Sequence, residues 1–100
     1  MVNDKVETRI YEMVNMWNGR SWLSLKRSAL TGNTSLNKRS GLNLDPEDFS
    51  ELLAEVFAEF GLNLNDVDLS VYYPKLRNNE KSLTIDMLID SAKAGRWLYE

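Results

Sequence analysis

The fold is decided by the stretch Leu44-Asp-Pro-Glu-Asp-Phe-Ser-Glu-Leu-Leu-Ala-Glu-Val-Phe-Ala-Glu-Phe-Gly61. Asp45 suits the N-cap of a helix, Pro46 the first helical position, and Gly61 a left-handed C-terminus. Leu44 and Phe49 have the spacing of a hydrophobic staple. The apolar residues recur at the spacing of one helical face, at Phe49, Leu52, Leu53, Val56, Phe57 and Phe60. This pattern predicts an amphipathic helix from about residue 46 to residue 60.

The same helix carries a second, acidic row of side chains. Its glutamates recur every four residues, and two aspartates lie near its start; the set is Asp45, Glu47, Asp48, Glu51, Glu55 and Glu59. Such a row has two interpretations: an ordinary solvated face, or a surface that binds a basic protein partner. We expect Glu47, Asp48, Glu51 and Glu55 to be substantially exposed and to contact such a partner.

Two further helices are predicted on either side. One extends from about residue 2 to residue 17, with an apolar face of Val6, Ile10, Met13, Val14 and Trp17. The other follows Leu83 and the N-cap Thr84, reaches about residue 94 and ends at Gly95, with Lys93 in its last turn; its apolar face is Ile85, Leu88, Ile89 and Ala92. Residues 97–99 read as an apolar tail that folds back onto the bundle.

The connections give weaker patterns. Trp22, Leu23 and Leu25 fit an extended stretch or a turn, and residues 28–30 fit a brief helix. Residues 31–36 are rich in turn formers and predict a loop whose Leu36 reaches the core. A short helix is possible around residues 65–69. We therefore expect one all-α domain over residues 1–100, a small helical bundle with three main helices and a possible short fourth. The apolar face of residues 49–60 should pack against Ile10, Val14, Leu36, Leu88 and Ile89.

Composition argues against most catalytic and metal chemistry. The 100 residues include no cysteine and no histidine, which removes thiol nucleophiles, thiolate ligands and the commonest acid–base group. The five glycines are scattered, so no phosphate-binding loop is present. Asp66-Val-Asp68 resembles the start of a calcium loop but lacks the glycine and glutamate that should follow. We expect no enzyme activity, no cofactor and no metal site.

The net charge of −3 is unevenly distributed. Residues 1–40 contain seven basic and three acidic residues, whereas residues 41–100 contain five basic and twelve acidic residues. Either the basic segment packs near the acidic helix and relieves its repulsion, or the acidic face is free to attract a basic partner. Basic and aromatic residues alternate at Trp17, Arg20, Trp22, Lys26 and Arg27, but a pI of about 5.0 favours a core role for the tryptophans over nucleic-acid binding. No signal peptide or membrane-spanning run is recognised, so a cytoplasmic location is the expectation.

The order of these elements resembles an acyl carrier protein. Four parts of the chain are together similar to a small bacterial group named only as domain of unknown function 1493. They are Thr34-Ser35-Leu36, Gly41-Leu42, the acidic helix ending in Phe60-Gly61-Leu62, and the closing run from Leu83-Thr84-Ile85 to Gly95-Arg96-Trp97. The likeness covers about residues 31–97. In acyl carriers, a Gly-Ala-Asp-Ser-Leu motif starts the second helix, its serine carries a 4′-phosphopantetheine arm, and the acidic helix docks basic patches on partner enzymes.

This chain departs from the carrier pattern at the modified serine. Alignment places that serine at Leu44 or Pro46, neither of which has a hydroxyl group. The resemblance thus implies the carrier shape and its acidic helix without the prosthetic group. We expect a non-enzymatic interaction module that docks a basic partner through this helix. Two alternatives stay open: an active carrier modified at Ser40 or Ser50, and a small acidic protein that neutralises a toxin or regulates a basic nuclease. The sequence does not predict the oligomeric state.

Overall fold

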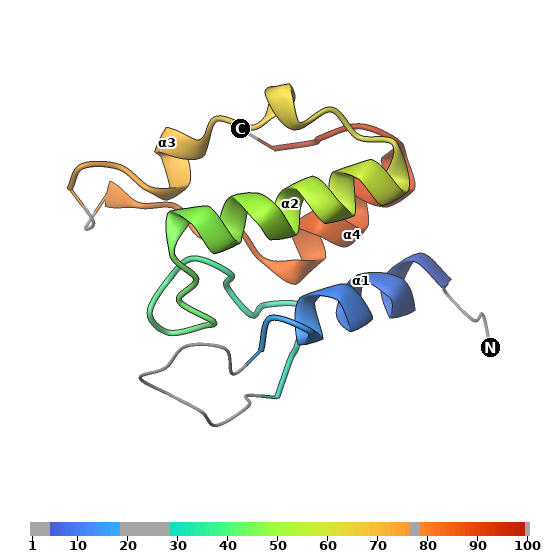
Figure 1. Cartoon of the computed structure of the whole chain (residues 1–100), viewed down its shortest axis with the longest axis horizontal. Helices are drawn as coiled ribbons and strands as arrows, with labels where there is room; N and C mark the ends of the chain where they lie inside the picture. Colours follow the sequence, from blue (N-terminus) through green and yellow to red (C-terminus); the bar gives the residue numbers. More distant parts are fainter. Residues whose placement is uncertain (1–4, 19–28, 77–78, 100) are drawn as a thin grey trace.

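The computed structural model describes residues 5–18, 29–76 and 79–99 (Figure 1). It contains the helices α1 (Lys5–Asn15), α2 (Pro46–Phe60), α3 (Leu69–Tyr72) and α4 (Ile85–Ala94), and a 3₁₀ turn η1 (Leu64–Asp66). The described residues contain no strand, only an isolated bridge between Ser35 and Thr84. The prediction of an all-α chain with three main helices is confirmed for this part of the chain.

The ends of α2 are fixed as the sequence predicts. The Asp45 side chain accepts a hydrogen bond from the Asp48 backbone N–H at 2.8 Å, and Pro46 occupies the first turn. Gly61 adopts the left-handed conformation, with φ of 71°, which favours glycine. Leu44 and Phe49 are both buried, as a hydrophobic staple requires. The helix therefore has a defined start, end and entry angle.

The final helix is also fixed at both ends. Thr84 caps α4 by accepting from the Met87 N–H at 3.4 Å, and Gly95 ends the helix with φ of 78°. Leu83 and Leu88, which have the spacing of a hydrophobic staple, are fully buried. α1 begins at Lys5 in the described residues and ends at Asn15, two residues earlier than expected. It ends there because the Trp17 N–H bonds to the Val14 carbonyl in a tighter turn.

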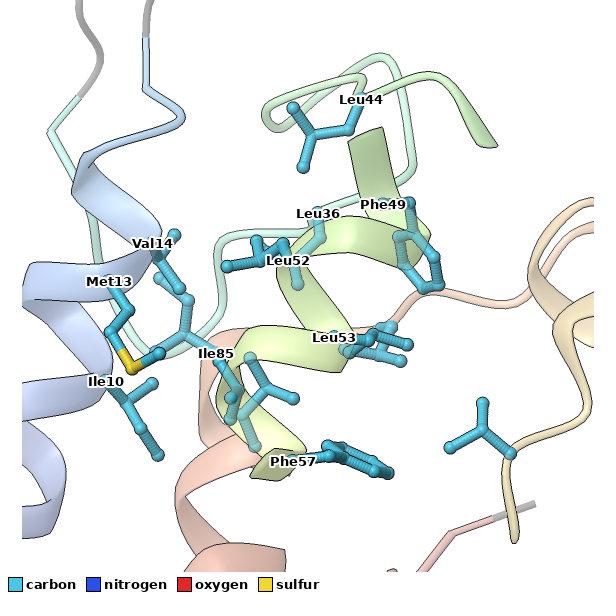
Figure 2. Packing of buried hydrophobic residues seen from close by; sticks show 14 of the residues in the cluster. Ile10, Met13, Val14, Leu36, Leu44, Phe49, Leu52, Leu53, Phe57 and Ile85 are labelled. Carbon is cyan, nitrogen blue, oxygen red and sulfur yellow. The ribbon is translucent and has the colours of Figure 1, made fainter. Parts of the chain in front are cut away.

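One hydrophobic core joins the three main helices, and α1 packs against both α4 and α2. Figure 2 shows Ile10, Met13 and Val14 of α1 directed toward Leu52 of α2 and Ile85 of α4. The predicted core face of α2 is confirmed except at Phe60, which is only partly buried. The expected partners Ile10, Val14, Leu36, Leu88 and Ile89 all belong to the same cluster, as do Trp17 and Trp97.

The segment after α2 differs from the prediction. Instead of one short helix around residues 65–69, η1 and α3 are separate turns with Val67 and Asp68 between them. Asn63 caps η1, and Asp68 caps α3 by accepting from the backbone N–H and hydroxyl of Ser70. Because Asp68 caps a new helix, the first turn cannot continue through it. Trp22, Leu23, Leu25 and Ser28 lie outside the described residues, and residues 29–30 are not helical.

The loop before α2 is held by the segment before α4 and by the first turn of α4. The Leu36 N–H donates to the Leu83 carbonyl at 2.8 Å, and the Asp86 N–H donates to the Gly32 carbonyl at 2.9 Å. At Gly41 the loop turns so tightly that an added Cβ would overlap the Ser35 carbonyl. These contacts place the start of α2 relative to the rest of the bundle.

A buried side chain, Asn37, completes this attachment. Its amide nitrogen donates to the carbonyls of Tyr72 at 3.0 Å and Lys81 at 2.7 Å. Its amide oxygen accepts from the Leu83 N–H at 2.9 Å and the Ser35 hydroxyl at 3.1 Å. All four hydrogen-bonding positions of the amide are thus used.

Candidate interaction surface

The glutamates Glu47, Glu51, Glu55 and Glu59 form an exposed row along α2, and we call this row the acidic face. It lies on α2 away from the buried residues Leu52, Leu53, Val56 and Phe57. At a rise of about 1.5 Å per residue, the row extends over roughly 18 Å. The structure therefore presents the predicted glutamates together on one rigid helix.

The two aspartates at the start of α2 have different surroundings. Asp45 is exposed, but one of its carboxylate oxygens serves the N-cap. Asp48 is half-buried and therefore less exposed than predicted. It lies in the first turn, where its negative charge interacts favourably with the positive end of the helix dipole. Both aspartates therefore have a role in the helix start, in addition to any role at a surface.

Glu59 pairs with a cation of α1. Arg9 binds it through two nitrogen atoms, with Nε 2.5 Å from Oε2 and Nη2 3.1 Å from Oε1. Arg9 also lies 3.5 Å from Glu12. The hydrogen bond from Arg9 lowers the pKa of Glu59 below that of an ordinary glutamate, and the same bond raises the pKa of Arg9. Here the basic N-terminal segment does approach the acidic helix, whereas Arg20, Lys26 and Arg27 lie outside the described residues.

Glu55 lies where the acidic face meets α1. The indole N–H of Trp17 points to its carboxylate at 3.4 Å, a long hydrogen bond, and the Trp17 ring itself is buried. Among the described residues, no salt bridge reaches Glu47, Glu51 or Glu55. The carboxylates toward the start of α2 are thus more available to an external cation than Glu59.

A groove adjoins the acidic face between α1 and α2. It has a volume of about 480 Å³, and its lining residues are Arg9, Met13, Met16, Glu55, Ala58 and Glu59. Met16 is 69% exposed, although its side chain is large and apolar. The helical pattern of the sequence does not predict this groove. Its signal was Met16, an apolar residue outside the predicted apolar face of α1.

The remaining candidates are dispersed. Ser40 is exposed in the loop before α2, and Ser50 is half-buried within α2. The two positions where the predicted resemblance would place a carrier serine, Leu44 and Pro46, are a buried staple residue and a first-turn proline. The described residues contain no group of three or more acidic side chains placed to hold a metal ion, and none of their helices is long and apolar enough to cross a membrane.

Comparison with known proteins assigns the chain to a family. No curated protein and no solved structure matches it. A family profile described as "Protein of unknown function (DUF1493)" matches residues 3–100. The match extends to most of the first thirty residues, which lie outside the likeness over residues 31–97 seen in the sequence. Because it covers nearly the whole chain, the protein belongs to the DUF1493 family.

Proposed function

We propose that this protein is a non-enzymatic interaction module, shaped like an acyl carrier protein, whose acidic face docks a basic surface of a protein partner. The observation that carries the proposal is the row of exposed carboxylates on α2, a helix whose opposite side is fixed in the core. Since the helix is capped at both ends, the row is already ordered before a partner arrives, which reduces the entropic cost of binding.

The charge arrangement itself supports a role in binding. Glutamates four residues apart repel each other and destabilise a helix by about 0.2–0.5 kcal/mol per pair. Among the described residues, only Glu59 of the acidic face has a salt-bridge partner, Arg9. A basic partner would relieve the repulsion among Glu47, Glu51 and Glu55, so binding and helix stability would favour the same complex.

The carrier-like shape is supported by the order of elements. A first helix, a long connection, an acidic helix, two short turns and a final helix follow one another along the chain. The position of a carrier serine is taken by Leu44 or Pro46, which supports a docking role without a prosthetic group. If the partner proves to be a basic nuclease, that result would favour the alternative in which this chain is a toxin-neutralising or regulatory protein.

The experiment begins with affinity capture of the full chain's partner from the native host and its identification by mass spectrometry. Association kinetics are then measured at low and high salt for the parent and for Glu51→Lys. Asp66→Lys, an equal charge reversal at an exposed residue off α2, is the matched control.

Glu51→Lys should slow association by about tenfold at low salt and reduce the salt dependence of the association rate. The control Asp66→Lys should change the association rate little. An affinity that is insensitive both to Glu51→Lys and to ionic strength would show that the acidic face is only a solvated surface.

A further inference from the structure

We infer that the partner segment is a basic amphipathic helix, with an apolar side chain that enters the groove between α1 and α2 while its cations lie along the acidic face. This inference rests on the proposed function and specifies the chemistry of the partner. A uniformly basic surface would satisfy the glutamates and leave the groove empty.

The groove has the size of a binding pocket, and half of its lining residues are apolar. Its volume of about 480 Å³ lies within the roughly 300–1,000 Å³ of common binding pockets. Met13 and Ala58 contribute apolar surface, and the flexible side chain of Met16 lies exposed beside them. A single exposed apolar residue is ordinary on a protein surface, but here it lines a hollow. Methionine also adapts its shape to different apolar partners.

The groove and the acidic face form one continuous surface because Glu55 and Glu59 belong to both. Glu47 and Glu55 are eight residues apart, or about 12 Å along α2. A partner helix of roughly two turns can cover this length with one cationic side, while an apolar residue of a neighbouring side enters the groove. The spacing therefore suits an amphipathic helix.

Arg9 makes the two ends of this surface differ in charge. At the groove end it pairs with Glu59, so a positive charge lies beside this end of the acidic face. Because Arg9 neutralises Glu59, this end of the acidic face should attract a partner's cations less strongly than Glu47 and Glu51 do. The partner's basic residues should thus lie toward the start of α2 and its apolar residue toward Arg9, which sets one orientation.

Two synthetic peptides test the inference. Both have eighteen residues and the same number of lysines on one helical side; one has leucine and the other alanine on the neighbouring side that would face the groove. Binding to the full chain is measured by fluorescence anisotropy. The leucine peptide should bind on the order of tenfold more tightly, because a leucine side chain is removed from water.

Variants of the chain then locate the leucine effect. Met16→Ser should reduce the leucine advantage to less than about threefold, and Ala58→Phe, which fills the groove from α2, should have the same effect. Leu76→Ser is the matched control, since Leu76 is 65% exposed and does not line the groove. Circular dichroism checks that each variant is folded.

The outcomes separate the inference from the proposed function. A leucine advantage that survives in either groove variant, or that is also lost in Leu76→Ser, overturns the groove as the apolar site. Glu51→Lys should weaken binding of both peptides by the same factor. If it weakens neither, the proposed function fails, whatever the groove variants show.

Discussion

Replacing Asn37 with leucine would remove a fully buried amide and keep a side chain of similar size. The four hydrogen bonds of this amide, between 2.7 and 3.1 Å long, join the loop before α2 to the end of α3 and to the segment before α4. Three of the partners are backbone groups, of Tyr72, Lys81 and Leu83. The Ser35 hydroxyl still accepts from the Lys38 N–H after the change. The main loss therefore falls on the three backbone partners.

The size of the effect follows from those three groups. A net contribution of about 1 kcal/mol per hydrogen bond, or more where a buried partner is left unpaired, gives a loss of at least about 3 kcal/mol. The free energy of unfolding of such a domain is about 5–15 kcal/mol, so the change removes a large fraction of it. With about 4–8 °C per kcal/mol for a chain of this length, Tm should fall by roughly 12–24 °C.

Thermal unfolding followed by circular dichroism measures this fall in Tm. Asn33→Leu is the matched control, because Asn33 is exposed in the same loop and its replacement should change stability by less than about 0.5 kcal/mol. If Asn37→Leu melts within about 4 °C of the parent, the buried amide does not hold the three segments together and the argument fails.

Three further predictions test the core, the ion pair and the missing serine. Leu53→Ala should cost about 2–5 kcal/mol, since Leu53 is fully buried, and a melting point within a degree or two of the parent would contradict the assigned core. The lowered pKa of Glu59 means that its pair with Arg9 stabilises the fold at neutral pH and is lost as pH falls through that pKa. The difference in unfolding free energy between the parent and Glu59→Gln, from denaturant titrations, should therefore shrink below about pH 4. Incubation with coenzyme A and a promiscuous phosphopantetheinyl transferase should leave the intact mass unchanged; a gain of one phosphopantetheine on Ser40 or Ser50 would instead support the carrier alternative.

The helices that could be predicted from the sequence are those with local signals at both ends. α2 has a capping aspartate, a first-turn proline and a terminal glycine around a regular apolar face, and its bounds match the structure. α4 has Thr84 and Gly95 in the same roles. The region after α2 was harder, because Leu64, Val67 and Val71 fit one helical spacing while the cap at Asp68 divides it into two turns.

The features that could not be predicted depend on residues far apart in the chain. Asn37 bonds to groups 35 to 46 positions away, and no local pattern marks it as more than a loop residue. Periodicity did predict that the glutamates share a face. The Arg9–Glu59 pair and the groove depend on how α1 lies against α2, which periodicity does not determine.

The attachment of the loop at residues 32–36 to residues 83–86 has a consequence for biosynthesis. A chain emerging from the ribosome exposes α1, the loop and α2 before the segment that holds them has been made. The apolar side of α2 lacks its α4 partner until residue 94 has been synthesised, so the native core cannot close before that point in translation. Pairings this distant in sequence also slow folding, since a long loop must close before these contacts form. A chain that stopped before Leu83 would have an uncovered hydrophobic surface and would be a substrate for chaperones or proteases.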